Sequence, residues 1–240
     1  MSEKMKQTGS GLGGIREQID ATDREMLDLL SRRAGLVTQV AQAKALSDDR
    51  RVIRPAREVA QMRAFLSWYK AQHMAMPVTG FLAVWREIIS ASICQQIDLQ
   101  VATVAQTAVA ARGQFGSAAT YQQFDTPADA LAGMDIAAQH IAVLPVADDN
   151  WWADLPDGLV AFAALPLLGD EITAICVGAV ELEETGDDIT LVSCTAAQLP
   201  DNGRVIASYG AQRLVALTGF LRDMDSSLKP VGTIGLIGHN

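Results

Sequence analysis

The chain has few of the residues that build metal centres and disulfide frameworks. Its three cysteines, Cys94, Cys176 and Cys194, are far apart and form no CxxC pair, and its three histidines are equally scattered. Structural zinc sites and small secreted scaffolds need such residues in clusters. The sequence therefore predicts free, buried thiols in a reducing cytoplasm and no metal site.

Long apolar runs are also absent. No run approaches the roughly 20 residues that span a bilayer, and the start, MSEKMKQTGSG, lacks the apolar segment of a signal peptide. With 49% hydrophobic and 20% charged residues over 240 positions, the composition is typical of globular proteins. We expect a cytoplasmic protein of one large or two small domains, with no membrane partner.

Basic residues are almost missing from the second half. Residues 1–100 hold 14 Lys and Arg against 11 Asp and Glu, whereas residues 101–240 hold 5 against 17. No basic residue occurs between Arg112 and Arg204. Such a division predicts two domains with different partners, and it argues against a nucleic-acid partner for the second half.

A glycine motif near the N-terminus, GSGLGG at 9–14, matches the GxGxxG spacing of dinucleotide sites. Such a site needs a preceding strand to aim the loop and the helix N-terminus at a pyrophosphate. Only a short polar tail precedes the motif here. We therefore predict a flexible leader over residues 1–14 and no cofactor.

Helical spacing of apolar residues dominates the first hundred residues. It predicts a helix over about 15–46, which would be roughly 45–50 Å long at 1.5 Å per residue. SDDRR at 47–51 interrupts it, and two further helices are predicted over about 55–73 and 81–99. Because the long helix cannot bury its apolar stripe within one subunit, we expect a helical homodimer.

The stretch LLSRRAGLVTQVAQAK at 29–44 places two cations on that apolar stripe. Arg33 and Lys44 lie about three turns apart and point the same way, at positions where the spacing predicts another leucine. A cation in such a place is costly unless an anion meets it. The anion could belong to the protein or to a ligand.

Three blocks carry a resemblance to a known family: IREQIDATDREMLDLLSRRAGLVTQVAQAK, RPARE and WREIISASICQQ. Together they resemble the all-helical (AroQ-class) chorismate mutases, most closely the N-terminal mutase domain of bifunctional chorismate mutase–prephenate dehydratases. The resemblance covers about residues 12–100. It implies a three-helix fold intertwined as a homodimer over residues 15–100, and a mutase that serves phenylalanine and tyrosine biosynthesis by isomerising chorismate to prephenate.

The resemblance also implies a site. The reaction is an intramolecular rearrangement, so the protein need only hold a compact conformer and stabilise charge as the ether bond breaks. Guanidinium groups suit the two carboxylates, and a lysine suits an oxygen. The implied catalytic residues are Arg33, Lys44, Glu58 and Gln96. The implied substrate-binding residues are Arg16, reaching into the partner subunit's site, Arg57, Ser92 and Arg54, which replaces an aspartate of some members.

The second half has a different pattern. Short apolar or β-branched runs predict strands near 99–105, 140–146, 158–167, 172–182 and 189–195. TPADALAGMD at 126–135 predicts a helix with Thr126 as its cap and Pro127 in its first turn. We therefore expect a small α/β domain over residues 101–240, in which Trp151 and Trp152 pack rather than bind.

This region resembles a reduced prephenate dehydratase region, with departures that affect chemistry. Asp148 and Asp149 stand where that family has Asn and Ser, and Ala174 and Ile175 follow Thr173 in place of Arg and Phe. A stretch with no basic residue would also repel dianionic prephenate. We therefore expect that dehydratase activity is lost.

Two alternatives remain open at this point. One is a bifunctional enzyme that keeps both the mutase and the dehydratase activities. The other is a non-catalytic module whose second half binds an aromatic amino acid, as an effector, or another enzyme of the pathway.

Overall fold

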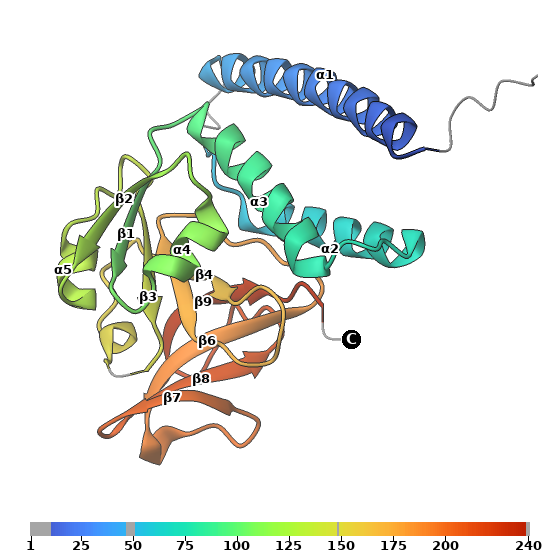
Figure 1. Ribbon diagram of the computed structural model, residues 1–240. Coiled ribbons are helices and arrows are strands. Elements are labelled where there is room, and N and C mark those ends of the chain that lie inside the picture. Colours follow the sequence, from blue (N-terminus) through green and yellow to red (C-terminus); the bar gives the residue numbers. More distant parts are fainter. Residues whose placement is uncertain (1–10, 47–50, 148, 239–240) are drawn as a thin grey trace, which may run out of the picture. The chain divides into compact units, whose positions relative to one another are not determined.

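The computed structural model of the chain describes residues 11–46, 51–147 and 149–238 (Figure 1). The chain divides into two compact units, residues 1–50 and 51–240. None of the helices in the described ranges is long and apolar enough to cross a membrane.

The described part of the first unit is one helix, α1 (Leu12–Ala45). It confirms the predicted helix over 15–46 but begins at Leu12, because Gly13 and Gly14 continue the helix instead of ending the leader. Residues 1–10 of the predicted leader and 47–50 of the predicted break lie outside the described residues. No residue of α1 is buried, so its apolar stripe needs a partner.

The second unit begins with two helices, α2 (Pro55–Gln72) and α3 (Val78–Cys94). The predicted start of α2 at Pro55 is confirmed, whereas α3 begins and ends earlier than the predicted 81–99. The four-residue apolar spacing continues past Cys94, which is why the sequence predicted a longer helix. The chain instead turns at Gln95 and buries Leu99, which is 1% exposed, just before the sheet begins.

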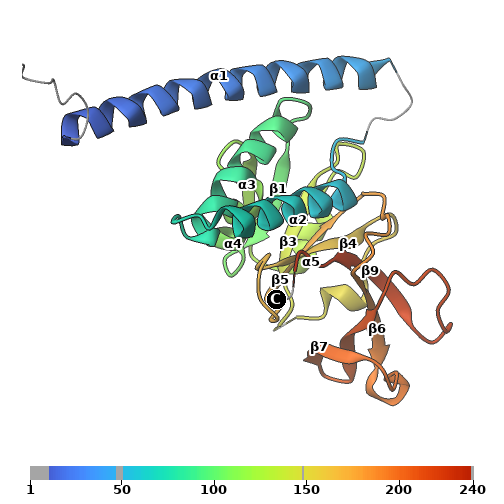
Figure 2. The ribbon, with the colours of Figure 1, turned by 90° about the vertical axis from the view of Figure 1, so that its right-hand side faces the viewer.

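Aromatic side chains join α2 to α3. The rings of Phe65 and Trp85 stack with centroids 4.2 Å apart, and Trp68 and Tyr69 pack on Phe81 at 5.9 and 5.3 Å. Offset aromatic pairs at such distances add specific stabilisation to the area they bury. The two helices accordingly lie beside each other in both views (Figures 1 and 2).

The rest of the described chain forms one sheet with two small helices, α4 (Ala108–Phe115) and α5 (Pro127–Ala132). This confirms the α/β class. The predicted cap of α5 is also confirmed, because Thr126 Oγ1 accepts a hydrogen bond from the Asp129 amide at 3.1 Å. The nine strands are β1 (Gln100–Val104), β2 (Thr120–Phe124), β3 (Ile141–Pro145), β4 (Val160–Leu165), β5 (Ala174–Gly178), β6 (Asp188–Thr195), β7 (Arg204–Tyr209), β8 (Gln212–Thr218) and β9 (Lys229–Gly235).

The strands lie in the order β2-β1-β3-β5-β4-β9-β6-β8-β7. At one end β1, β2 and β3 are parallel, and the connections through α4 and α5 place these helices on either side of β1 (Figure 1). At the other end β6, β7, β8 and β9 pair antiparallel. Trp151 and Trp152 lie in the segment that connects β3 to β4. Both side chains are buried, which confirms their predicted packing role.

The two ends of the sheet meet at one close approach. β4 and β9 pair in parallel through Ala161 and Gly232. A Cβ built on Gly232 would lie 2.0 Å from the Ala161 carbonyl oxygen and 2.5 Å from its nitrogen. Only glycine lets the backbones come this close.

Within one chain, α2 and α3 share a core with the sheet. Met62, Ile89 and Phe162 belong to one buried apolar cluster. Arg63 of α2 adds hydrogen bonds between the helix and the sheet region. Its guanidinium donates to the Thr185 carbonyl at 2.6 Å and to the Leu236 carbonyl at 2.6 and 2.9 Å. The domain boundaries 1–14, 15–100 and 101–240 stay predictions.

Candidate functional site

The sequence-predicted site residues fall into two groups, one on α1 and one on α2 and α3. On α1, the side chains of Arg33 and Lys44 are half-buried, whereas Arg16 is exposed. Large apolar residues on the same face of α1 remain about half-exposed, among them Ile19 at 54% and Met26 at 51%. The helix therefore carries its two cations within an apolar face, as the spacing predicted.

At the start of α2, two of the predicted residues face outward. Arg54 is the N-cap residue and forms an ion pair with Glu183 at 3.5 Å, with both side chains partly exposed. Arg57 is exposed. Exposed pairs of this kind contribute little to stability, so Arg54 is not held there by a strong protein contact.

Glu58, in contrast, meets a basic residue that the sequence analysis did not include. Its Oε2 accepts a hydrogen bond at 2.8 Å from Nη1 of Arg86, which lies on α3 and is 2% exposed. Nε of Arg86 donates to the Gln114 carbonyl, also at 2.8 Å. A buried arginine needs such an anion and such an acceptor, so the pair fixes the position of Glu58.

Ser92 and Gln96 lie together on the last turns of α3. The Ser92 hydroxyl donates to the Ile88 carbonyl at 2.7 Å, and Gln96 Nε2 donates to the Ser92 carbonyl at 2.9 Å. Gln96 Oε1 is buried and has no hydrogen-bond partner among the described residues. The structure thus brings Ser92 and Gln96 together on α3, whereas Glu58 on α2 pairs with Arg86.

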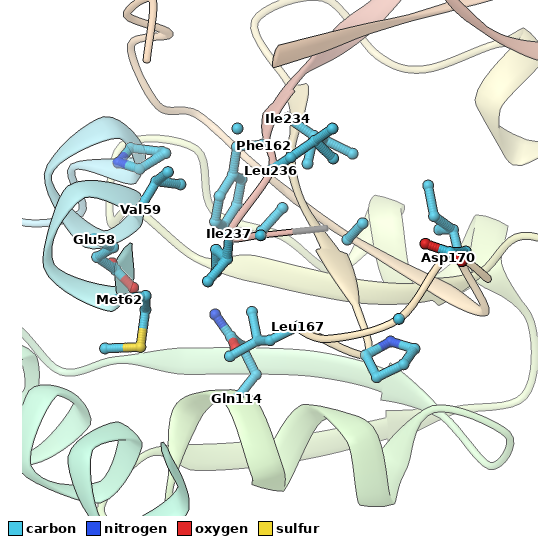
Figure 3. A pocket seen from close by; sticks show the side chains of 18 of the residues that line it. Glu58, Val59, Met62, Gln114, Phe162, Leu167, Asp170, Ile234, Leu236 and Ile237 are labelled. Atoms are coloured by element: carbon cyan, nitrogen blue, oxygen red, sulfur yellow. The ribbon is translucent and has the colours of Figure 1, made fainter. Parts of the chain in front are cut away.

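A cavity of about 60 Å³ opens beside Glu58 (Figure 3). Its walls come from α2, the first residues after β4, and the chain that follows β9, and they are largely apolar. Four charged residues line it: Glu58, Arg86, Asp170 and Arg204. Two of these are basic and lie outside the stretch 113–203 in which the sequence has no Lys or Arg.

Thr173 and Asp149, which stand at dehydratase-like positions, form hydrogen bonds within the fold. Thr173 Oγ1 donates to the Leu165 carbonyl at 3.2 Å. The Asp149 carboxylate accepts hydrogen bonds from the backbone amides of Asn150 and Trp151, which shapes the turn before Trp151. Asp148 lies outside the described residues.

The three thiols are free, as predicted, but only Cys176 and Cys194 are buried, because Cys94 is partly exposed. Burial raises the pKa of the Cys176 thiol, and it also raises that of Cys94. A raised pKa keeps a thiol protonated and unreactive at neutral pH. Among the described residues, no group of three or more His, Cys, Asp or Glu could hold a metal ion.

One comparison with known proteins gives a match. Residues 15–97 match the family model described as chorismate mutase type II. The long α1 with α2 and α3 fits the all-helical domain of that family. No curated protein and no solved structure matches the chain.

Proposed function

We propose that the chain is a chorismate mutase, which isomerises chorismate to prephenate by a pericyclic rearrangement in phenylalanine and tyrosine biosynthesis in the cytoplasm. The family match over residues 15–97 supports mutase activity in general. The observation that carries the proposal is the placement of Arg33 and Lys44 within the apolar face of α1. Two cations that point the same way on one apolar face suit the carboxylates of a dianionic substrate.

The chemistry assigns a role to each residue of the proposed set. Lys44 and Gln96 donate hydrogen bonds to the ether oxygen, on which negative charge develops as the bond breaks. Glu58 accepts a hydrogen bond from the substrate hydroxyl, and Arg86 holds Glu58 Oε2 so that Oε1 remains for this purpose. The carboxylates are held by Arg16, Arg33, Arg57 and Ser92, and Arg54 adjusts substrate affinity.

The proposed site needs a second subunit, because α1 exposes its apolar face. Ile15, Ile19, Met26, Leu30 and Val40 are between 40% and 54% exposed. They lie on the face that carries Arg33 and Lys44. An isolated helix of this composition gains its stability mainly by burying such a face. In the homodimer, α1 of each chain packs against helices of its partner and Arg16 enters the partner's site.

The dimer is tested by charging the apolar face of α1. Met26→Glu places a carboxylate in the proposed interface, so we expect the chain to sediment as a monomer where the wild type sediments as a dimer. Gln42→Glu is the matched control, because Gln42 is exposed on the opposite face of the same helix. A monomeric wild type, or a Met26→Glu chain that dimerises as tightly as the control, would refute the dimer.

The activity is tested directly with the purified chain. We expect the ultraviolet absorbance of chorismate to fall with first-order kinetics at a rate proportional to protein concentration, with prephenate as the product. A rate equal to that of buffer alone would exclude the proposed function.

A dehydratase activity is not part of the proposal. The dehydratase-like segments supply no positive charge for the two carboxylates of prephenate, because they have aspartates at 148 and 149 and a hydrogen-bonded Thr173. We expect no phenylpyruvate when prephenate is incubated with the chain at protein concentrations that exhaust chorismate within minutes. Phenylpyruvate above the level formed in buffer would restore the bifunctional alternative.

A further inference from the structure

The segment that precedes α2 lies against a segment from the second half of the chain. Residues 51–54 lead into α2, and residues 180–183 follow β5. Ile53 is 3% exposed and belongs to the buried cluster against which Val180 and Leu182 also pack. Both segments line one small cavity of about 10 Å³. The two segments are therefore neighbours in the fold, held together by a shared apolar core.

Acidic side chains of the second segment pair with basic side chains of the first. Glu183 Oε1 lies 3.5 Å from Nη2 of Arg54, and Glu181 forms an ion pair with Arg51. The four side chains are between 37% and 58% exposed, so both pairs face solvent. Pairs this exposed are weak, because water and other anions compete for each partner. Another carboxylate can therefore displace Glu183 from Arg54 at little cost.

The two pairs differ in where their arginines lie. Arg54 is the N-cap residue of α2, and its carbonyl accepts a hydrogen bond from the Glu58 amide at 3.1 Å. It thus lies on the helix turn that carries Glu58, and both belong to the proposed mutase site. Arg51 lies three residues earlier and is not part of that site. Glu183 therefore neutralises a cation that is proposed to bind substrate, whereas Glu181 does not.

We propose that Glu183 sets the affinity of the mutase site for chorismate by competing with a substrate carboxylate for Arg54. This inference rests on the proposed function. Substrate has to displace the Glu183 carboxylate from the guanidinium, and it then lies near an additional negative charge. Glu183 is a positioning residue, because it acts through Arg54 and does not touch the reacting atoms. It lies outside the family match over residues 15–97, so the second half of the chain takes part in substrate binding.

The test compares the kinetics of chorismate loss for Glu183→Gln and the wild-type chain. Glutamine keeps the length of the side chain and removes its charge, so Arg54 becomes available to substrate. Because exposed ion pairs are weak, we expect KM to fall by only about two- to fivefold. We expect kcat to stay unchanged, since tighter binding of ground state and transition state alike alters KM alone.

The matched control is Glu181→Gln, which removes the same charge from the same segment but from the partner of Arg51. It should keep the wild-type KM. A second comparison repeats Glu183→Gln in a chain that carries Arg54→Gln. Because Glu183 acts through Arg54, its replacement should then have no effect on KM. Circular dichroism verifies the fold of each variant.

Three results would overturn the inference. The first is a KM for Glu183→Gln equal to or above that of the wild type. The second is an equal fall in KM for Glu181→Gln, and the third is a fall that persists without Arg54, since both would show a general effect of net charge. A wild-type chain that does not consume chorismate would instead refute the proposed function, and this inference with it. The two kinds of failure are therefore distinguishable.

Discussion

Arg33→Ala and Lys44→Ala are each expected to lower the turnover of chorismate by about 100-fold or more while the fold stays intact. A preorganised donor directed at developing charge is worth about 3–4 kcal/mol of barrier, and truncation to alanine removes it completely. Neither residue is a stabilising core residue, because both are only half-buried on α1. The measurement is the initial rate of chorismate loss at saturating substrate, with helix content followed by circular dichroism.

The matched control is Arg32→Ala. Arg32 is adjacent to Arg33 and is exposed on another face of α1, so its removal changes the same net charge without touching the proposed site. It should retain nearly the full rate. The assignment fails if Arg33→Ala, with its helix content intact, is as active as Arg32→Ala.

Gly232→Ala is expected to destabilise the second unit by about 3 kcal/mol, which is at the upper end for a single methyl group. The new Cβ would lie 2.0 Å from the Ala161 carbonyl oxygen, and its neighbours there are backbone atoms that cannot rotate away. Relief would require β4 and β9 to separate at the pairing that joins the two ends of the sheet. Urea unfolding followed by tryptophan fluorescence measures the change.

Gly113→Ala provides the comparison for that experiment. Gly113 lies inside α4, and a Cβ there meets nothing within 4 Å. Alanine at such a helical position should stabilise the chain by up to about 1 kcal/mol. An unfolding midpoint for Gly232→Ala within error of the wild type would show that the close approach between β4 and β9 is not a constraint.

The helices of the first hundred residues could be predicted because their apolar spacing is regular and the residues that start or interrupt them are clear. Pro55 in the first turn of α2 is an unambiguous start signal. The end of α3 was predicted five residues late, because Ile97 and Leu99 continue the apolar pattern although they belong to the turn into the sheet. The spacing of apolar residues alone cannot distinguish the last turn of a helix from a buried turn that follows it.

Five of the nine strands correspond to predicted runs: β1, β3, β4, β5 and β6. Nearly every residue of β1, β3, β5 and β6 is buried, and half of β4 is. No run was predicted for β2, β7, β8 or β9: TYQQF of β2 is polar and mostly exposed, β7 has no buried residue, and KPVGTIG of β9 contains a proline and two glycines. β8 was missed although four of its seven residues are buried. Strands of this kind depend on their neighbours in the sheet as well as on their own composition.

Arg86 is a buried charged residue beside Glu58 that the sequence analysis did not single out. It lies in WREII, one residue after Trp85 and three before the buried Ile89, so its phase on α3 placed it toward the core. The same reasoning that identified Arg33 and Lys44 could have found it. Its partners could not have been found this way, because Gln114 and the residues that follow β9 meet it only through the tertiary fold.

The most direct test of the central claim is subunit complementation between Arg16→Ala and Lys44→Ala. In the proposed dimer, each site combines Lys44 of one chain with Arg16 of the other. A mixed dimer therefore keeps one site with both residues. Random reassociation after joint unfolding and refolding makes about half of the dimers mixed, so a mixture of the two inactive variants should recover about a quarter of the wild-type rate. A mixture that stays as inactive as its two components would contradict a mutase site shared between two chains.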